Sequence, residues 1–160
     1  MCRKNTATKN KGKKKMKNNN NIIWKFVPKT HKQYKVNNLG ELFHKTRAGK
    51  WRQICGTPAG KIHNTKYGEQ RYTQVLINGK FRYLHRVVLE SFVKQPTLPK
   101  NVDILHLKTN SKHFCTIQVD HKNNDITDNR LENLHWVSWL TNNLNTHHED
   151  FDVNGNWKGL

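Results

Sequence analysis

The chain has few cysteines, few acidic residues and no long apolar run. Cys2, Cys55 and Cys115 are odd in number and far apart, with no Cys-x-x-Cys pair. This pattern argues against a disulfide framework and a thiolate zinc site, so we expect idle thiols and no zinc. No apolar stretch approaches the roughly 20 residues of a membrane-spanning helix. The basic start leads into asparagines, so we expect no signal peptide and an intracellular protein, cytoplasmic or nuclear.

Acidic residues number 11 against 29 lysines and arginines in 160 residues, which gives a net charge of +18. Such an excess indicates a polyanionic partner, with nucleic acid as the first candidate and an anionic membrane surface as the second. Hydrophobic residues make up 34% of the chain, below the roughly 45–50% of ordinary globular proteins. We therefore expect one modest domain with extensions.

The first 21 residues are rich in lysine and asparagine and contain no acidic residue. They lack the apolar side chains that would offset the loss of chain entropy, so we expect a disordered basic tail. Lys13, Lys14 and Lys15 are candidates for phosphate contact. A nuclear-localisation patch and a solvated tail without a role are the alternatives.

Residues 22–83 are expected to form a β-rich element. Asn78-Gly79 between two β-prone runs predicts a hairpin. Apolar residues then recur at helical spacing, which predicts a helix over 84–94. Residues 97–118 show no period and are expected to form an insert, and residues 149–160 form a C-terminal tail.

The segment 114–148 carries the residues suited to chemistry. Its pattern predicts a strand, a polar loop, a second short strand and a helix. Asp120 and His121 close the first strand, Asn133 precedes the second strand, and Asn142 lies in the helix. Antiparallel strands packed on that helix would bring Asp120 close to Asn142.

These residue types fit the hydrolysis of a phosphodiester. Carboxylate and amide oxygens suit Mg²⁺, which uses few protein ligands and keeps several waters. Asp120 and Asn142 fit that role, with Asn143 as a neighbouring alternative to Asn142. A neutral imidazole accepts a proton near neutral pH, so His121 is the natural base. His147 and His148 are more simply read as solvated cations than as metal ligands.

The chain resembles HNH endonucleases of the phage and homing-endonuclease type. An upstream run, Leu84-His85-Arg86-Val87-Val88, resembles a helix that precedes the motif in these proteins, and residues 24–40 resemble their modular DNA-contacting element. The motif itself is matched by Asp120-His121, Asp128-Asn129-Arg130, Glu132-Asn133-Leu134, Trp136-Val137-Ser138 and Asn142.

The resemblance implies an α+β protein with short β-hairpins upstream and a C-terminal ββα-metal unit, the HNH nuclease domain, over 84–148. It implies His121 as general base and Asp120 and Asn142 as ligands of one Mg²⁺ or Mn²⁺. Asn133 would brace the loop and orient the histidine. It also implies products with 5′-phosphate and 3′-hydroxyl ends.

We therefore expect a metal-dependent endonuclease of the homing type that acts on double-stranded DNA as a monomer. The alternatives are an inactive DNA- or RNA-binding module built on such a nuclease, and an RNA-packaging protein that binds through charge alone. Basic residues along the chain are candidates for phosphate contact. Besides the three lysines of the tail, they are Lys35, Arg47, Lys50, Arg52, Arg86 and Arg130.

Overall fold

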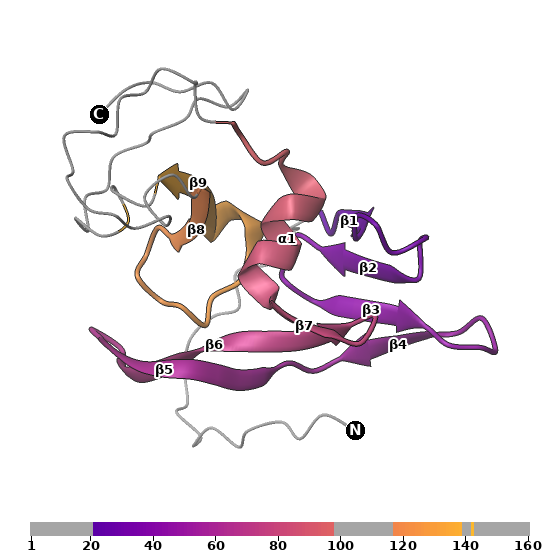
Figure 1. Ribbon diagram of the computed structural model, residues 1–160, viewed down its shortest axis with the longest axis horizontal. Helices are drawn as coiled ribbons and strands as arrows, with labels where there is room; N and C mark the ends of the chain where they lie inside the picture. The colour runs from indigo at the N-terminus through magenta and orange to yellow at the C-terminus, as the bar shows by residue number, and fades with distance from the viewer. Residues whose placement is uncertain (1–20, 98–116, 139–141, 143–160) are drawn as a thin grey trace, which may run out of the picture.

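The computed structural model describes residues 21–97, 117–138 and 142. The described chain is a mixed α+β structure of three antiparallel sheets around one α-helix (Figure 1). The elements are β1 (Trp24–Phe26), β2 (Tyr34–Asn37), β3 (Leu42–Lys45), β4 (Trp51–Ile54), β5 (Thr57–Thr65), β6 (Gly68–Ile77), β7 (Lys80–Tyr83), α1 (Leu84–Phe92), β8 (Ile117–His121), the 3-10 turn η2 (Leu131–Asn133) and β9 (Leu134–Ser138).

The first sheet is a four-stranded meander in the order β1-β2-β3-β4. Its turn between β2 and β3 includes Gly40, whose φ of +83° lies in the region that favours glycine. A Cβ atom at Gly40 would lie 2.8 Å from the backbone oxygen of Asn129. The backbones of Gly40 and Asn129 lie so close that only glycine fits at position 40. This contact joins the first sheet to the loop that precedes η2.

The second sheet is dominated by a long hairpin of β5 and β6, with β7 on its other side. Asn78 and Gly79 form the turn between β6 and β7 with φ values of 48° and 75°, as the Asn-Gly signal predicts. β5 is an edge strand, and its register against β6 shifts between Ala59 and His63. An edge position tolerates Pro58, because its missing N–H is not needed by a neighbouring strand.

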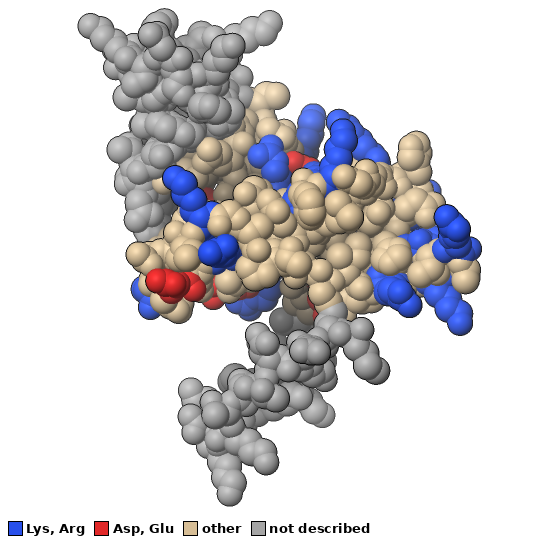
Figure 2. Space-filling model, turned by 60° about the horizontal axis from the view of Figure 1, so that its bottom comes forward, with Lys and Arg blue, Asp and Glu red and all other residues tan. Residues whose placement is uncertain are grey.

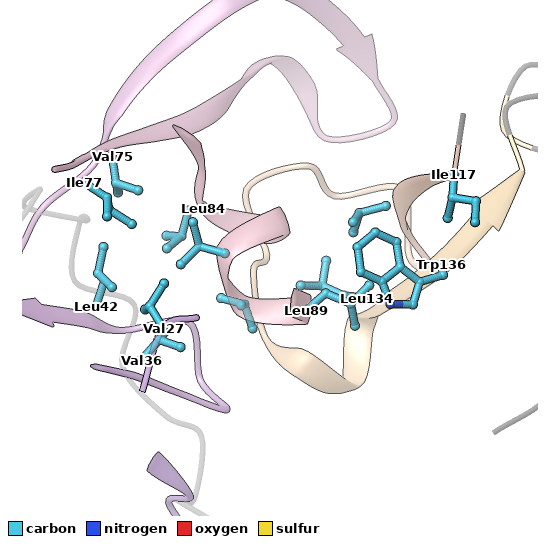
Figure 3. Packing of buried hydrophobic residues seen from close by; sticks show 13 residues of the cluster. Val27, Val36, Leu42, Val75, Ile77, Leu84, Leu89, Ile117, Leu134 and Trp136 are labelled. Atoms are coloured by element: carbon cyan, nitrogen blue, oxygen red, sulfur yellow. The ribbon is translucent and has the colours of Figure 1, made fainter. Parts of the chain in front are cut away.

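The third sheet is the ribbon of β8 and β9, in which Asp120 pairs with His135 and His121 pairs with Leu134. α1 lies between this ribbon and the other two sheets (Figure 1). Figure 3 shows the helix inside one apolar cluster, with Leu84 toward the side of Val75 and Ile77 and Leu89 toward Leu134. One core therefore holds all three sheets, and burial of this apolar area is the main favourable term in folding.

Several expectations are met with small differences, and one is wrong. The predicted helix begins at Leu84 and ends at Phe92 rather than at residue 94, because Val93 adopts an extended backbone. The strand expected over 114–119 is described from residue 117 and continues to His121 as β8, and the strand expected over 134–137 is present as β9, which ends at Ser138. The helix of the ββα unit lies outside the described residues except for Asn142, which is helical. Cys55 is disulfide-bonded, so the expectation of idle thiols is wrong for it. Spacing along the chain does not report which cysteines meet in the fold.

Residues 1–20 and 98–116, and most of 139–160, lie outside the described residues. The expected tail, the insert and the C-terminal segment fall largely or wholly there. Within the described part, no helix is long and apolar enough to cross a membrane.

Candidate active site

A pocket of about 340 Å³ lies between the β8–β9 unit and the β5–β6 hairpin. Asp120 and His121 reach it from the end of β8, and Asn142 reaches it from the segment after β9. The structure thus brings together at one pocket the carboxylate, the imidazole and the distant amide that the sequence predicts to act together. The remaining lining residues are His63, Asn64, Thr65, Lys66, Tyr72, Asn124 and Ile126.

The Asp120 carboxylate is held by a neighbour on the adjacent strand. Its Oδ2 atom lies 3.1 Å from Nε2 of His135, the residue paired with it across the ribbon. Burial acts to raise the pKa of Asp120, but the hydrogen bond from His135 and contacts with His121 outweigh it and bring the pKa below its ordinary value. Asp120 is therefore an anion at neutral pH, as a cation ligand must be.

The His121 side chain is 2% exposed although it lines the pocket. Burial lowers its pKa below the ordinary value, and nearby groups, Asp120 among them, offset only part of that effect. The imidazole is therefore neutral at pH 7 and able to accept a proton. Its Nε2 atom is buried and makes no well-formed hydrogen bond with the described residues.

Asn142 is oriented by Gln118, which lies two residues before Asp120 on β8. The Nδ2 group of Asn142 donates a hydrogen bond of 2.5 Å to Oε1 of Gln118. This contact uses the amide nitrogen and leaves the amide oxygen Oδ1 as the ligand atom.

Asn133 braces the loop that joins β8 to η2. Its Oδ1 accepts the backbone N–H of Asn123 at 3.0 Å, and its Nδ2 donates to the backbone oxygen of Asp128 at 2.8 Å. Its backbone oxygen accepts the N–H of Lys122 at 2.9 Å. The side chain is 6% exposed, so it ties both ends of the loop beside His121 from within.

The hairpin wall of the pocket is not anticipated from the sequence. His63, Asn64 and Thr65 of β5, with Lys66 in the turn, line the pocket together with Asp120. Residues 63–66 are all polar and show no alternation that would mark a strand, so neither the strand nor the pocket that it lines could be found from the sequence.

Aromatic rings pack against the imidazole of His121. The ring of His85 lies 5.2 Å from that of His121 and 5.0 Å from that of Tyr72 (centroid to centroid), and it stacks on Tyr83 at 5.5 Å. Burial, with smaller contributions from His121 and Arg86, lowers the pKa of His85 to about 3. This second histidine is therefore neutral, and it limits the space into which His121 can turn.

The donor set of the pocket fits a hard divalent cation. Within residues 21–97, 117–138 and 142, no three His, Cys, Asp or Glu side chains are grouped as metal ligands. A cation beside Asp120 would therefore have one carboxylate, the Asn142 amide oxygen, and water or phosphate oxygens around it. Mg²⁺ and Mn²⁺ accept such oxygen sets, whereas structural zinc sites use four protein ligands.

The predicted DNA contacts fall into two groups. Lys35, Arg47, Lys50 and Arg52 lie on or beside the first sheet, and the ammonium of Lys35 lies 4.4 Å from the ring centroid of Trp24 and 4.6 Å from that of Trp51. Lys13, Lys14 and Lys15 lie outside the described residues. Basic side chains are spread over the face shown in Figure 2, with fewer acidic ones between them.

The other two predicted contacts are engaged within the chain. Arg130 forms ion pairs with Asp128 at 2.7 Å and Glu132 at 2.8 Å, and Arg86 pairs with Glu90 at 2.7 Å. No lysine of the described ranges forms an ion pair with another described residue. The charges of the described lysines, and of Arg47 and Arg52 near the first sheet, are therefore not neutralised by an ion pair with a described carboxylate.

Comparison with known proteins yields one similar structure. No family model matches the chain, and no curated protein matches it. The similar structure is that of the HNH homing endonuclease I-HmuI, described for its DNA binding and cleavage, with 24% sequence identity and a TM-score of 0.45. The match covers 77% of this chain and 56% of that chain.

Proposed function

We propose that the chain is a metal-dependent endonuclease that hydrolyses phosphodiester bonds of double-stranded DNA, in the manner of homing endonucleases. The observation that supports this most directly is the meeting of Asp120, His121 and Asn142 at one pocket. The net charge of +18 supplies the attraction to a polyanion.

His121 acts as the general base toward the attacking water. Burial lowers its pKa, so the proton-accepting form dominates at neutral pH. Because Nε2 is buried, we assign proton acceptance to Nδ1. Asn133 keeps the loop beside His121 in place through its bonds to Asn123 and Asp128, which limits the positions that the imidazole can take.

Asp120 and Asn142 would hold a single Mg²⁺ or Mn²⁺, which when bound neutralises charge on the phosphate and the leaving oxygen. His135 and Gln118 hold the other polar atoms of these two side chains. The two ligand groups are thus kept in defined rotamers before any substrate arrives, which reduces the ordering cost of binding.

Lys66 binds the phosphate backbone from the opposite wall. It is the one lysine or arginine among the described residues that line the pocket, and it lies in the exposed turn between β5 and β6. Lys35, Arg47, Lys50 and Arg52 extend the contact over the first sheet. Phosphate contacts of this kind fix register without reading sequence, so target choice has to come from other groups.

The test uses supercoiled plasmid and the full chain, with Mg²⁺ or with a chelator. Wild type nicks or linearises the plasmid only with the metal, and His121→Ala loses about 10²–10⁴ in rate while binding DNA equally well. The nicks carry 5′-phosphate and 3′-hydroxyl ends, so DNA ligase closes them. Equal retardation of DNA with no cleavage by wild type would instead favour the inactive binding module, the second candidate.

A further inference from the structure

Each of the two candidate cation ligands is held by one polar side chain of the β8–β9 ribbon. His135 on β9 faces Asp120 across the ribbon, with Nε2 and Oδ2 3.1 Å apart. Gln118 on β8 accepts the Nδ2 group of Asn142 through Oε1. The His135 and Asp120 side chains are 18% and 27% exposed, so water competes only in part for this bond.

We propose that His135 and Gln118 are positioning residues for a divalent cation, Mg²⁺ or Mn²⁺, held by Asp120 and Asn142. Each contact uses the atom that the cation does not need. His135 engages one carboxylate oxygen and leaves the other, and Gln118 engages the amide nitrogen and leaves the amide oxygen. The inference rests on the proposed function, because it presupposes a cation between Asp120 and Asn142.

Gln118 and His135 lie on the same face of the β8–β9 ribbon as Asp120. Gln118 and Asp120 are two residues apart on β8, so their side chains leave the same face of the strand. His135 lies on that face because it pairs directly with Asp120. The register of β8 against β9 therefore places His135 beside Asp120, and the spacing along β8 places Gln118 on the same face as Asp120.

His135 acts through Asp120 rather than as a ligand. Asp120 and Asn142 both line the pocket, whereas His135 is not among the described residues that do. Its Nε2 atom, the one closest to Asp120, is engaged by the carboxylate. Outer partners of metal ligands typically change metal affinity about 10–100-fold when removed.

The experiment measures Mn²⁺ binding to the full chain by electron paramagnetic resonance. Asp120→Ala defines the signal that belongs to the site. His135→Phe and His135→Leu remove the donor, and each weakens Mn²⁺ binding about 10-fold or more. His135→Gln keeps an N–H donor at similar reach and stays within about 3-fold of wild type. His44→Phe, at a half-buried histidine on β3, is the matched control and changes nothing.

Gln118 is tested in the same assay by its own pair of variants. Gln118→Leu removes the acceptor for Asn142 and weakens Mn²⁺ binding about 10-fold, whereas Gln118→Glu keeps an acceptor oxygen and does not weaken it. Circular dichroism checks that each variant is folded.

The outcomes separate the inference from the proposed function. If Asp120→Ala binds Mn²⁺ as wild type does, the cation site and the proposed function fail together. If Asp120→Ala loses binding while His135→Phe, His135→Leu and Gln118→Leu keep it, only the positioning roles are overturned. If His135→Gln and His135→Phe weaken Mn²⁺ binding equally, the N–H donor does not account for the effect of His135, which also overturns the inference.

Discussion

Gln70 and Asp125 are 55 residues apart in the chain and are joined by a hydrogen bond of 2.9 Å from Nε2 to Oδ1. The same Gln70 side chain accepts the backbone N–H of Ile126 through Oε1 at 3.2 Å. One amide thus fastens the β5–β6 hairpin to the loop beside His121. The two walls of the pocket are held at a fixed separation by this side chain.

Gln70→Ala should loosen the loop without unfolding the protein. Loss of two hydrogen bonds in a half-buried position is expected to cost about 1–2 kcal/mol. The amide of Ile126 then exchanges faster with solvent, which hydrogen exchange measured by mass spectrometry detects. Gln70→Glu places a carboxylate against Asp125 and is expected to destabilise the loop more than alanine does. Unchanged exchange in both variants would mean that the hairpin is held by other contacts.

Asn133 is expected to matter for rate more than for DNA binding. Asn133→Ala removes the bonds to Asn123 and Asp128 inside the loop, at a cost of about 1–3 kcal/mol for the buried groups left without partners. Plasmid cleavage falls, and retardation of DNA stays the same. Asn133→Asp keeps the acceptor but loses the donor, so an intermediate rate is expected. A cleavage rate equal to wild type in both variants would remove the bracing role.

Lys66→Met tests whether the hairpin turn contacts phosphate. Removal of one phosphate contact is expected to lower the slope of log affinity against log salt by about 1. Lys66→Arg keeps the charge and should leave the slope unchanged. Fluorescence titration of duplex DNA at several salt concentrations measures it. The same slope in wild type and Lys66→Met would place Lys66 outside the interface.

The lowered pKa of His85 is expected to make the free energy of unfolding fall as the pH decreases. Its pKa is about 3 in the folded chain, so between pH 6.5 and 3 the unfolded chain binds a proton that the folded chain does not. The stability that comes from burying His85 in its neutral form is fully present above pH 6.5 and is lost as the pH falls toward 3. Between pH 6.5 and pH 5 the loss from this one group is at most about 2 kcal/mol.

Urea unfolding at pH 7 and pH 5 measures this effect. The His85→Phe variant lacks the titrating group, so its free energy of unfolding should fall less than that of wild type between the two pH values. An identical decrease in both proteins would show that His85 is not the group responsible.

Turn residues and the spacing of apolar residues predict several elements of the fold. The elements that they miss have a physical explanation. Asn78-Gly79 is recognised because few residues other than glycine and asparagine adopt positive φ at both turn positions. Residues 57–65 fall within the expected β-rich element but are not predicted as a separate strand, and Pro58 and Gly60 are residues that usually weaken strands. An edge position with a shifted register accommodates both.

Some residues of the candidate site can be predicted from the sequence and others cannot. Asp120, His121 and Asn142 stand out because their residue types and spacings carry chemistry by themselves. Gln70 and His135 do not stand out, because their importance arises only from tertiary contact. His135 meets Asp120 through strand register, and a shift of one residue would place it on the other face.

The most direct test of the proposed site is the position of the cation itself. Crystals of the full chain with duplex DNA and Mn²⁺ would be measured for anomalous scattering by manganese. The proposed function predicts an anomalous peak that the Asp120 carboxylate and the Asn142 amide oxygen both coordinate, beside His121. A manganese ion bound elsewhere, with none shared by Asp120 and Asn142, would contradict it.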